Sequence, residues 1–246
     1  MFEQHVVVST RHGTMPAFAV CPDEAGQWPA VIFYMDAPGT RSELMHMARN
    51  IAKQGYYCLM PDLYYRLGTI RFDLPRREDT MSGVIRACVN HAVNIEQITD
   101  DTGAMLNFLD GQQQVTPGPV GAVGYCMGGP MITWAASRFP ERIKGAASLY
   151  GIRMATEDSH SPHLEAAKVQ GELYYGFAET DRAAPPETIE ALRASLVAAG
   201  VKHQIEVLPG TEHGFCFPER GHYVPAAAEL VWQRLFSLWD RTLKGR

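Results

Sequence analysis

The sequence predicts an α/β fold built on a mainly parallel central sheet, with helices on both faces and a hairpin at the N-terminus. Strand-like and helix-like segments alternate through most of the chain after the first thirty residues, and this alternation is typical of a parallel sheet. Residues 30–35 form an apolar run without polar alternation, as expected of a strand that helices cover on both faces. Two β-rich runs, 6–9 and 15–20, flank a turn-like segment at 11–14 and predict the hairpin.

Apolar residues that recur at the helical period predict the helices. In residues 42–55 they form one stripe between Ser42, which can cap the helix, and Gly55, which can end it. Residues 62–91 lack a clean period, so we expect either a functional insertion or a partly helical cover. The last helix carries a stripe that should pack on the sheet, namely Ala228, Val231, Leu235 and Leu238. Further helices are expected at 94–109, 127–139, 185–200 and from 225 onwards, with strands at 56–61, 119–125, 145–150, 169–177 and 203–208.

Length and composition bound the function. The 246 residues suit a single domain, 1–246, without a repeat or linker. A formal charge of -5 offers no electrostatic footprint for nucleic acid or acidic lipid, so a small molecule is the expected partner. The chain shows neither a signal-peptide pattern nor an apolar stretch of about 18 residues, so we expect no membrane association and a cytoplasmic location. Five widely spaced cysteines predict free thiols.

Residues 120–129 carry the strongest chemical signal. A buried-strand pattern runs into Gly124-Tyr125-Cys126-Met127-Gly128 and then into a helix, which is the arrangement of a nucleophile elbow with sulfur in place of the hydroxyl. Cys126 would lie at the start of a helix, where the helix dipole and a nearby imidazole favour the reactive thiolate. The alternative interpretation is a small buried cysteine in a glycine-rich turn.

An acid and a histidine follow the elbow in the expected chain order. Asp181 comes after the strand predicted at 169–177, and we expect its carboxylate to orient the base. Glu179 is the rival, and either carboxylate could instead only cap the next helix. His213 lies on a glycine-flanked loop after a late strand and is the predicted general base. No His-x-x-x-His or Glu-x-x-His pair occurs on a predicted helix, so no metal site is expected.

Backbone N–H groups would complete the site as an oxyanion hole. The N–H of Met127 directly follows the nucleophile and is the first predicted donor. In this architecture the second donor comes from the loop after the third strand, where Ala37 is the natural candidate. Such donors stabilise the negative charge that develops on a carbonyl oxygen under attack.

With these residues assembled, the sequence resembles the dienelactone hydrolase family, whose members have the α/β-hydrolase fold and a Cys-His-Asp triad. The resemblance implies Cys126 as nucleophile with Asp181 and His213 as its partners, and the N–H groups of Met127 and Ala37 as oxyanion donors. It also implies that an unsaturated lactone is opened through an acyl-enzyme and that no cofactor is required. The likeness spans nearly the whole chain and is carried by residues 36–39, 55–57, 61–64, 124–129, 150–151, Asp181 and 213–215.

Two positions depart from the family pattern. Well-studied members carry a glutamate after the third strand that interacts with the resting thiol, and this chain has the shorter Asp36 there. They also hold the substrate carboxylate with arginines, one of them four positions after the histidine, where this chain has Phe217. The resemblance therefore does not extend to the dienelactone itself as substrate. Candidate walls of the substrate pocket are Asp36, Tyr64, Tyr65 and Phe217, and the arginines available near the site are Arg66, Arg71, Arg76, Arg77 and Arg220.

The leading hypothesis is a hydrolase of a small carboxylic ester or lactone that works by covalent thiol catalysis. A glutamine amidotransferase-like amidase is a weaker alternative, because it predicts a His-x-Glu pair and the chain has Phe215 two residues after His213. The alternative from another class is a non-catalytic protein that keeps the fold and binds a small molecule. Either a monomer or a homodimer is compatible with the sequence.

Overall fold

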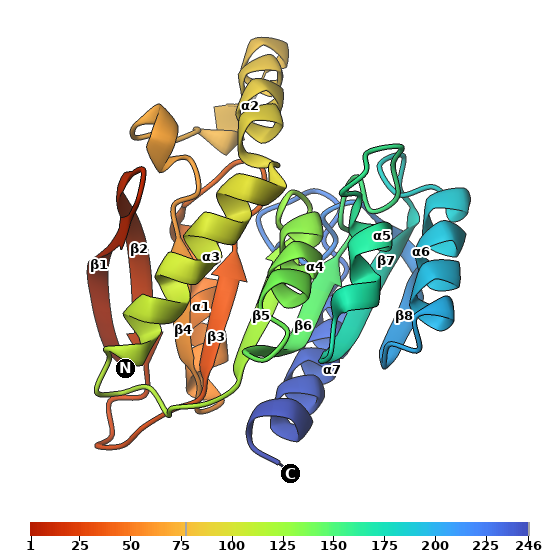
Figure 1. Cartoon of the computed structure of the whole chain (residues 1–246). Coiled ribbons are helices and arrows are strands. Elements are labelled where there is room, and N and C mark those ends of the chain that lie inside the picture. Colours follow the sequence, from red (N-terminus) through yellow and green to blue (C-terminus); the bar gives the residue numbers. More distant parts are fainter. Residues whose placement is uncertain (77, 246) are drawn as a thin grey trace.

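A single eight-stranded sheet organises the computed structural model, which describes residues 1–76 and 78–245 (Figure 1). Its strand order is β1-β2-β4-β3-β5-β6-β7-β8; β1 and β2 pair antiparallel, as do β2 and β4, and all later pairs are parallel. This confirms the predicted mainly parallel sheet. The strands are β1 (Phe2–Thr10), β2 (Gly13–Cys21), β3 (Ala30–Tyr34), β4 (Tyr57–Pro61), β5 (Val120–Tyr125), β6 (Ile143–Leu149), β7 (Glu172–Thr180) and β8 (His203–Glu212).

The strands follow the predicted pattern closely. β1 and β2 form the expected hairpin, and β3 is buried along its whole length. β7 begins three residues later than predicted, and β8 runs four residues further, because Thr180 pairs with Glu212 beyond a register shift. This extension carries the segments after both strands to the same edge of the sheet.

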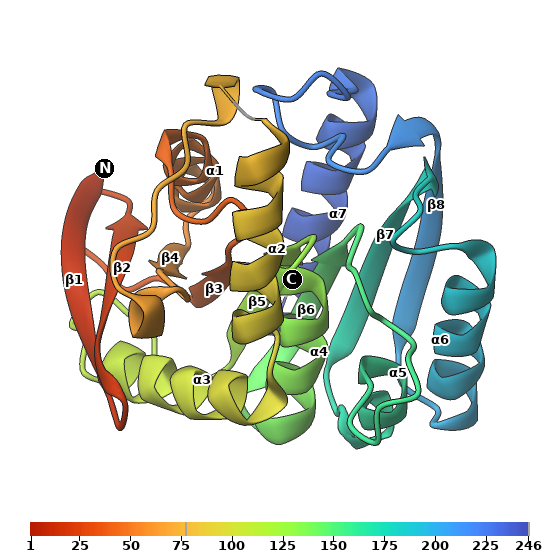
Figure 2. The same cartoon turned by 90° about the horizontal axis from the view of Figure 1, so that it is seen from above.

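Helices cover both faces of the sheet, as predicted. Seen from above, α1 and α7 lie on one side, and α3, α4 and α6 lie on the other (Figure 2). The predicted stripe of α7 is buried. Asn94 caps α3 by accepting the Gln97 N–H, whereas Ser42 is already helical and Arg41 occupies the cap position of α1 without a side-chain bond. The helices are α1 (Ser42–Lys53), α2 (Asp79–Ala92), α3 (Ile95–Asp110), α4 (Gly128–Arg138), α5 (Pro162–Glu165), α6 (Pro186–Ala198) and α7 (Pro225–Leu243).

Two glycines allow α7 to lie directly on the sheet. A Cβ at Gly121 of β5 would come within 2.9 Å of the Trp239 ring, and one at Gly145 of β6 would collide with Thr242. The indole N–H of Trp239 donates to the Gly145 carbonyl at 3.2 Å. Small residues at the crossing thus let the helix bury its largest side chain against the backbone of the central strands.

Residues 62–76 and 78–91 form a partly helical cover, one of the two structures that the sequence predicts for this segment. They contain two short 3-10 turns, Tyr65–Leu67 and Leu74–Arg76, followed by α2, which stands above the carboxyl ends of the strands (Figures 1 and 2). Arg66 ties the first turn to Asp101 of α3 through a bidentate ion pair. Within the described part of the chain, no helix is long and apolar enough to cross a bilayer.

Candidate active site

The turn between β5 and α4 has the geometry of a nucleophile elbow. Cys126 has a φ of 52°, a left-handed backbone conformation that residues other than glycine adopt only at a cost in conformational energy. A Cβ at Gly124 would collide with the Gly128 carbonyl, and one at Gly128 would lie 2.6 Å from the Tyr34 carbonyl oxygen. The tight turn therefore requires glycine on both sides, and it raises the cysteine above the carboxyl edge of the sheet.

Backbone hydrogen bonds hold Cys126 in this position. Its N–H donates to the Leu149 carbonyl at 3.0 Å, and its own carbonyl accepts from the N–H groups of Gly129 and Ile152. The side chain is half-buried, and Met127 is the N-cap residue of α4. Cys126 therefore lies beside the positive end of an 11-residue helix, whose dipole attracts negative charge.

Asp181 and His213 meet across the ends of β7 and β8. The Nδ1 atom of His213 lies 2.6 Å from Oδ2 of Asp181, whose side chain is 2% exposed. The other oxygen of Asp181 accepts the Ala183 N–H at 2.8 Å, so the carboxylate is held on both sides. The rival acid, Glu179, instead accepts the N–H of Gly210. Of the two candidate acids, it is Asp181 that contacts the imidazole.

The surroundings of His213 favour its charged form. Burial alone would lower the pKa of the imidazole, but the hydrogen bond with Asp181, the interaction with the nearby Cys126 sulfur and the negative charge of Asp181 raise its pKa to about 10. The edge of the Tyr150 ring packs against the imidazole with 5.1 Å between ring centroids. A protonated imidazole beside the sulfur would stabilise a thiolate on Cys126.

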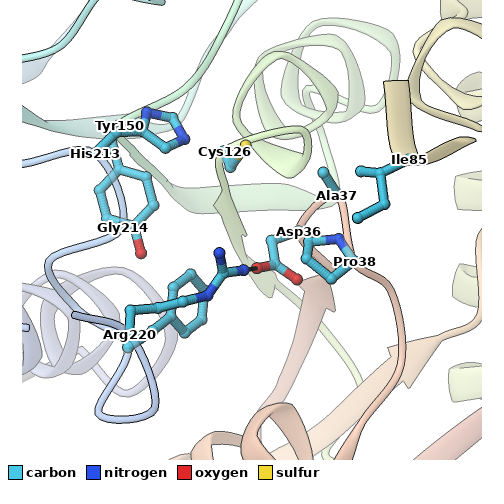
Figure 3. A pocket seen from close by; sticks show the side chains of 10 residues that line it. Asp36, Ala37, Pro38, Ile85, Cys126, Tyr150, His213, Gly214 and Arg220 are labelled. Atoms are coloured by element: carbon cyan, nitrogen blue, oxygen red, sulfur yellow. Dashed lines mark hydrogen bonds and ion pairs between the residues drawn. The ribbon is translucent and has the colours of Figure 1, made fainter. Parts of the chain in front are cut away.

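Cys126 and His213 open onto a cavity of about 150 Å³ (Figure 3). The cysteine lies between the imidazole on one side and Ala37 and Ile85 on the other, and Ile85 comes from the covering helix α2. Of the other predicted site residues, Asp36 and Phe217 line the cavity, whereas Met127 and Tyr64 are buried behind its wall. The cavity suits a small substrate, because sites for larger ligands span about 300–1,000 Å³.

Asp36 pairs with two arginines rather than standing alone beside the thiol. Its carboxylate is 2% exposed and accepts from Arg41 and Arg220, the latter at 3.2 Å. Both guanidinium groups also approach the Phe217 ring, at 5.1 and 5.6 Å from its centroid. Arg41 also forms an ion pair with Glu43, which accepts the Glu219 N–H. These ion pairs and this hydrogen bond connect the loop after β3 to the loop after His213.

The structure separates the candidate arginines. Arg66 pairs with Asp101, Arg71 with Asp62 and Arg76 with Asp73, and none of the three lines the cavity. Arg77 lies outside the described residues. Arg220 alone among the described candidates reaches the cavity wall.

Three cavity or network residues had no sequence signal of their own. Arg41 lies in an irregular loop, Ile85 falls in the segment without a clean period, and Tyr150 belongs only to the residues that carry the family resemblance. Tyr150 could have been found as a polar residue at the carboxyl end of β6, the edge where the other site residues gather. No grouping of three or more His, Cys, Asp or Glu side chains suited to a metal ion occurs within residues 1–76 and 78–245.

Comparison with known protein families matches residues 15–243 to the dienelactone hydrolase family. The chain belongs to this family of hydrolases. A Synechocystis relative is 27% identical over 97% of this chain and 96% of its own length, and a mouse carboxymethylenebutenolidase homolog is 27% identical over 83% of this chain and 77% of its own.

Solved structures show the same fold. A crystal structure from Klebsiella pneumoniae superposes with a TM-score of 0.86 at 23% identity and covers 98% of both chains. Dienelactone hydrolase from Anabaena variabilis superposes with a TM-score of 0.69 at 18% identity, again over 98% of both chains. The α/β-hydrolase fold of this family member is therefore confirmed.

Proposed function

We propose that this family member hydrolyses a small carboxylic ester or lactone by covalent thiol catalysis. The observation that carries the proposal is that Cys126 and His213 line the same small cavity while His213 contacts Asp181 at 2.6 Å. A nucleophile, a base and an orienting acid at one site are what acyl transfer requires.

The reaction divides into two steps. The Cys126 thiolate attacks the carbonyl carbon, and the oxygen takes up negative charge near the N–H groups of Met127 and Ala37. His213 then gives its proton to the departing alkoxide, which leaves a thioester on the sulfur. For a lactone, the released hydroxyl stays attached to the acyl group.

Deacylation uses the same residues in reverse. His213, now neutral, accepts a proton from water as the oxygen attacks the thioester. The thiolate leaves, the carboxylic acid is released, and the imidazole is again protonated. Asp181 orients the ring throughout and stabilises its charge.

Turnover of p-nitrophenyl acetate and a simple γ-lactone by point variants tests this assignment. Cys126→Ala and His213→Ala should each lower kcat by about 10³-fold or more, and Asp181→Asn by about 10²–10⁴-fold, because the members of a triad act as a unit. Cys21→Ala, which removes a buried thiol of β2, should leave turnover unchanged. A Cys126→Ala variant as active as the parent, or no turnover of any ester or lactone by the parent, would overturn the proposal; the latter result would favour a binding protein.

A further inference from the structure

Tyr64 is buried and hydrogen-bonded next to the loop that follows β3. It comes shortly after the carboxyl end of β4, and its side chain is fully buried. Its backbone N–H donates to Oδ1 of Asp62 at 3.2 Å, and Oδ2 of that buried carboxylate accepts from Arg71 at 2.7 Å. The N–H of Asp62 in turn donates to the Pro16 carbonyl. These hydrogen bonds therefore fix the backbone from which the Tyr64 side chain extends.

The hydroxyl of Tyr64 contacts both segments that are proposed to supply oxyanion donors. It donates to the Ala37 carbonyl at 2.6 Å and lies 3.3 Å from Sδ of Met127. The ring supports the same loop, because a Cβ at Gly39 would come within 3.3 Å of it. Ala37 lines the cavity and Tyr64 does not, so a substrate bound there would meet Ala37 and not the phenol.

The backbone at Ala37 needs such a tether. Residues 36–39 form a turn closed by the Gly39 N–H, which donates to the Asp36 carbonyl at 2.9 Å. Pro38 has no N–H and excludes only the helical conformation of Ala37, so other orientations of its peptide groups remain accessible. The Gly39 N–H holds the peptide that carries the Ala37 N–H, and a hydrogen bond to the Ala37 carbonyl holds the next peptide, so the two bonds together restrict the rotation of Ala37 and the direction of its N–H.

We propose that Tyr64 is a positioning residue, whose hydroxyl holds the Ala37 backbone in the orientation that stabilises the oxyanion. The inference rests on the proposed thiol mechanism and adds a residue that acts through the peptide backbone. Burial raises the pKa of Tyr64 well above its usual value, so the hydroxyl remains a donor throughout the working pH range.

Tyr64→Phe removes the hydroxyl and keeps the ring. We expect kcat for p-nitrophenyl acetate to fall by about 10–100-fold and KM to change less than twofold. Loss of a whole oxyanion donor lowers kcat by about 10²–10³-fold, and a misplaced donor should lower it less. The matched control is Tyr175→Phe, which also removes a buried hydroxyl, bonded to Thr133 at 2.9 Å, and should leave kcat unchanged. Installing p-aminophenylalanine at position 64 restores a donor and should recover most of kcat.

Alkylation of Cys126 by iodoacetamide separates positioning from general damage. This reaction requires the thiolate but forms no oxyanion, so Tyr64→Phe should be alkylated at the parent rate, with the modified residue identified by peptide mass spectrometry. Unchanged kcat, or an alkylation rate that falls as far as kcat, would overturn the role of Tyr64. Full activity of Cys126→Ala is the separate result that would remove the underlying mechanism.

Discussion

The charge on His213 decides whether the proposed nucleophile is ready to react. Its imidazole is held by Asp181 on one side and faces Cys126 on the other, and these contacts outweigh the effect of burial on its pKa. The usual pKa of histidine is 6.5, and the folded-state pKa of His213 is higher. His213 therefore stabilises the fold fully below pH 6.5, and this contribution is lost as the pH rises through about 10. The imidazolium should therefore persist through the neutral range.

Titration of His213 followed by NMR tests this charge assignment. In the parent, the imidazole should lose its proton near pH 10, and kcat/KM for a lactone should fall over the same interval because the departing alkoxide no longer receives a proton. Cys126→Ser and Asp181→Asn should both lower the pKa, since each removes a negative charge and alters a hydrogen bond that raise it. A parent imidazole that titrates near pH 6.5, or an imidazole pKa that does not change in Cys126→Ser, would contradict the assignment.

At the scale of elements, the cover helix α2 forms part of the cavity wall. Ile85 of α2 lines the wall beside Cys126, and the helix stands above the sheet edge where the proposed catalytic residues lie. The small cavity volume predicts a preference for short acyl chains. Specificity would then depend on a segment that contributes none of the proposed catalytic residues.

Ile85→Ala should shift that preference. Removing the apolar side chain enlarges the cavity, so the ratio of kcat/KM for p-nitrophenyl hexanoate to that for the acetate should rise by about tenfold. The neighbouring Val84, which is 49% exposed on the same helix, supplies the control Val84→Ala with an unchanged ratio. If the two variants behave alike, α2 does not limit the acyl chain.

The elements differ in how far the sequence could predict them. Buried strands and the elbow were predictable, because apolar runs and paired glycines are local consequences of burial and of a tight turn. Residues 62–91 were less predictable, since an ion pair between distant residues, Arg66 and Asp101, holds the first 3-10 turn, and the buried apolar stripe of α2 begins only at Ile85, in the middle of the helix. The pairing of Asp36 with Arg220 depends on two loops 184 residues apart, which no local pattern reports.

Considered as a whole, the molecule places several of its charged contacts between elements and its proposed reactive groups at one edge of the sheet. Glu165 of α5 shows the first feature, because its 3% exposed side chain pairs with Arg138 of α4 at 3.6 Å, in addition to Lys168 at 2.7 Å and His160 at 2.9 Å. Burial alone would raise the pKa of Glu165, but these bonds and the nearby Arg138 lower it. Because its folded-state pKa is lowered, Glu165 stabilises the fold above pH 4.5, the usual pKa of glutamate. This stabilisation is lost as the pH falls through the folded-state pKa.

Glu165→Gln should therefore destabilise the protein in a pH-dependent way. At pH 7 we expect the free energy of unfolding in urea to fall by about 2 kcal/mol, the usual size of a hydrogen bond to a buried charge. The difference from the parent should shrink as the pH falls below 4.5 and vanish below the lowered folded-state pKa, where the parent carboxylate is itself protonated. Glu187→Gln, at an exposed position in the first turn of α6, should show no such pH dependence. An equal loss at both pH values would show that charge is not the cause.

The most direct test of the thiol mechanism is peptide mass spectrometry of the protein quenched in acid during turnover of a p-nitrophenyl ester. We predict that the peptide containing Cys126 gains the mass of the acyl group and loses it on treatment with neutral hydroxylamine, as a thioester does. Steady turnover with the acyl group on another residue, or with Cys126 unmodified throughout, would contradict the account.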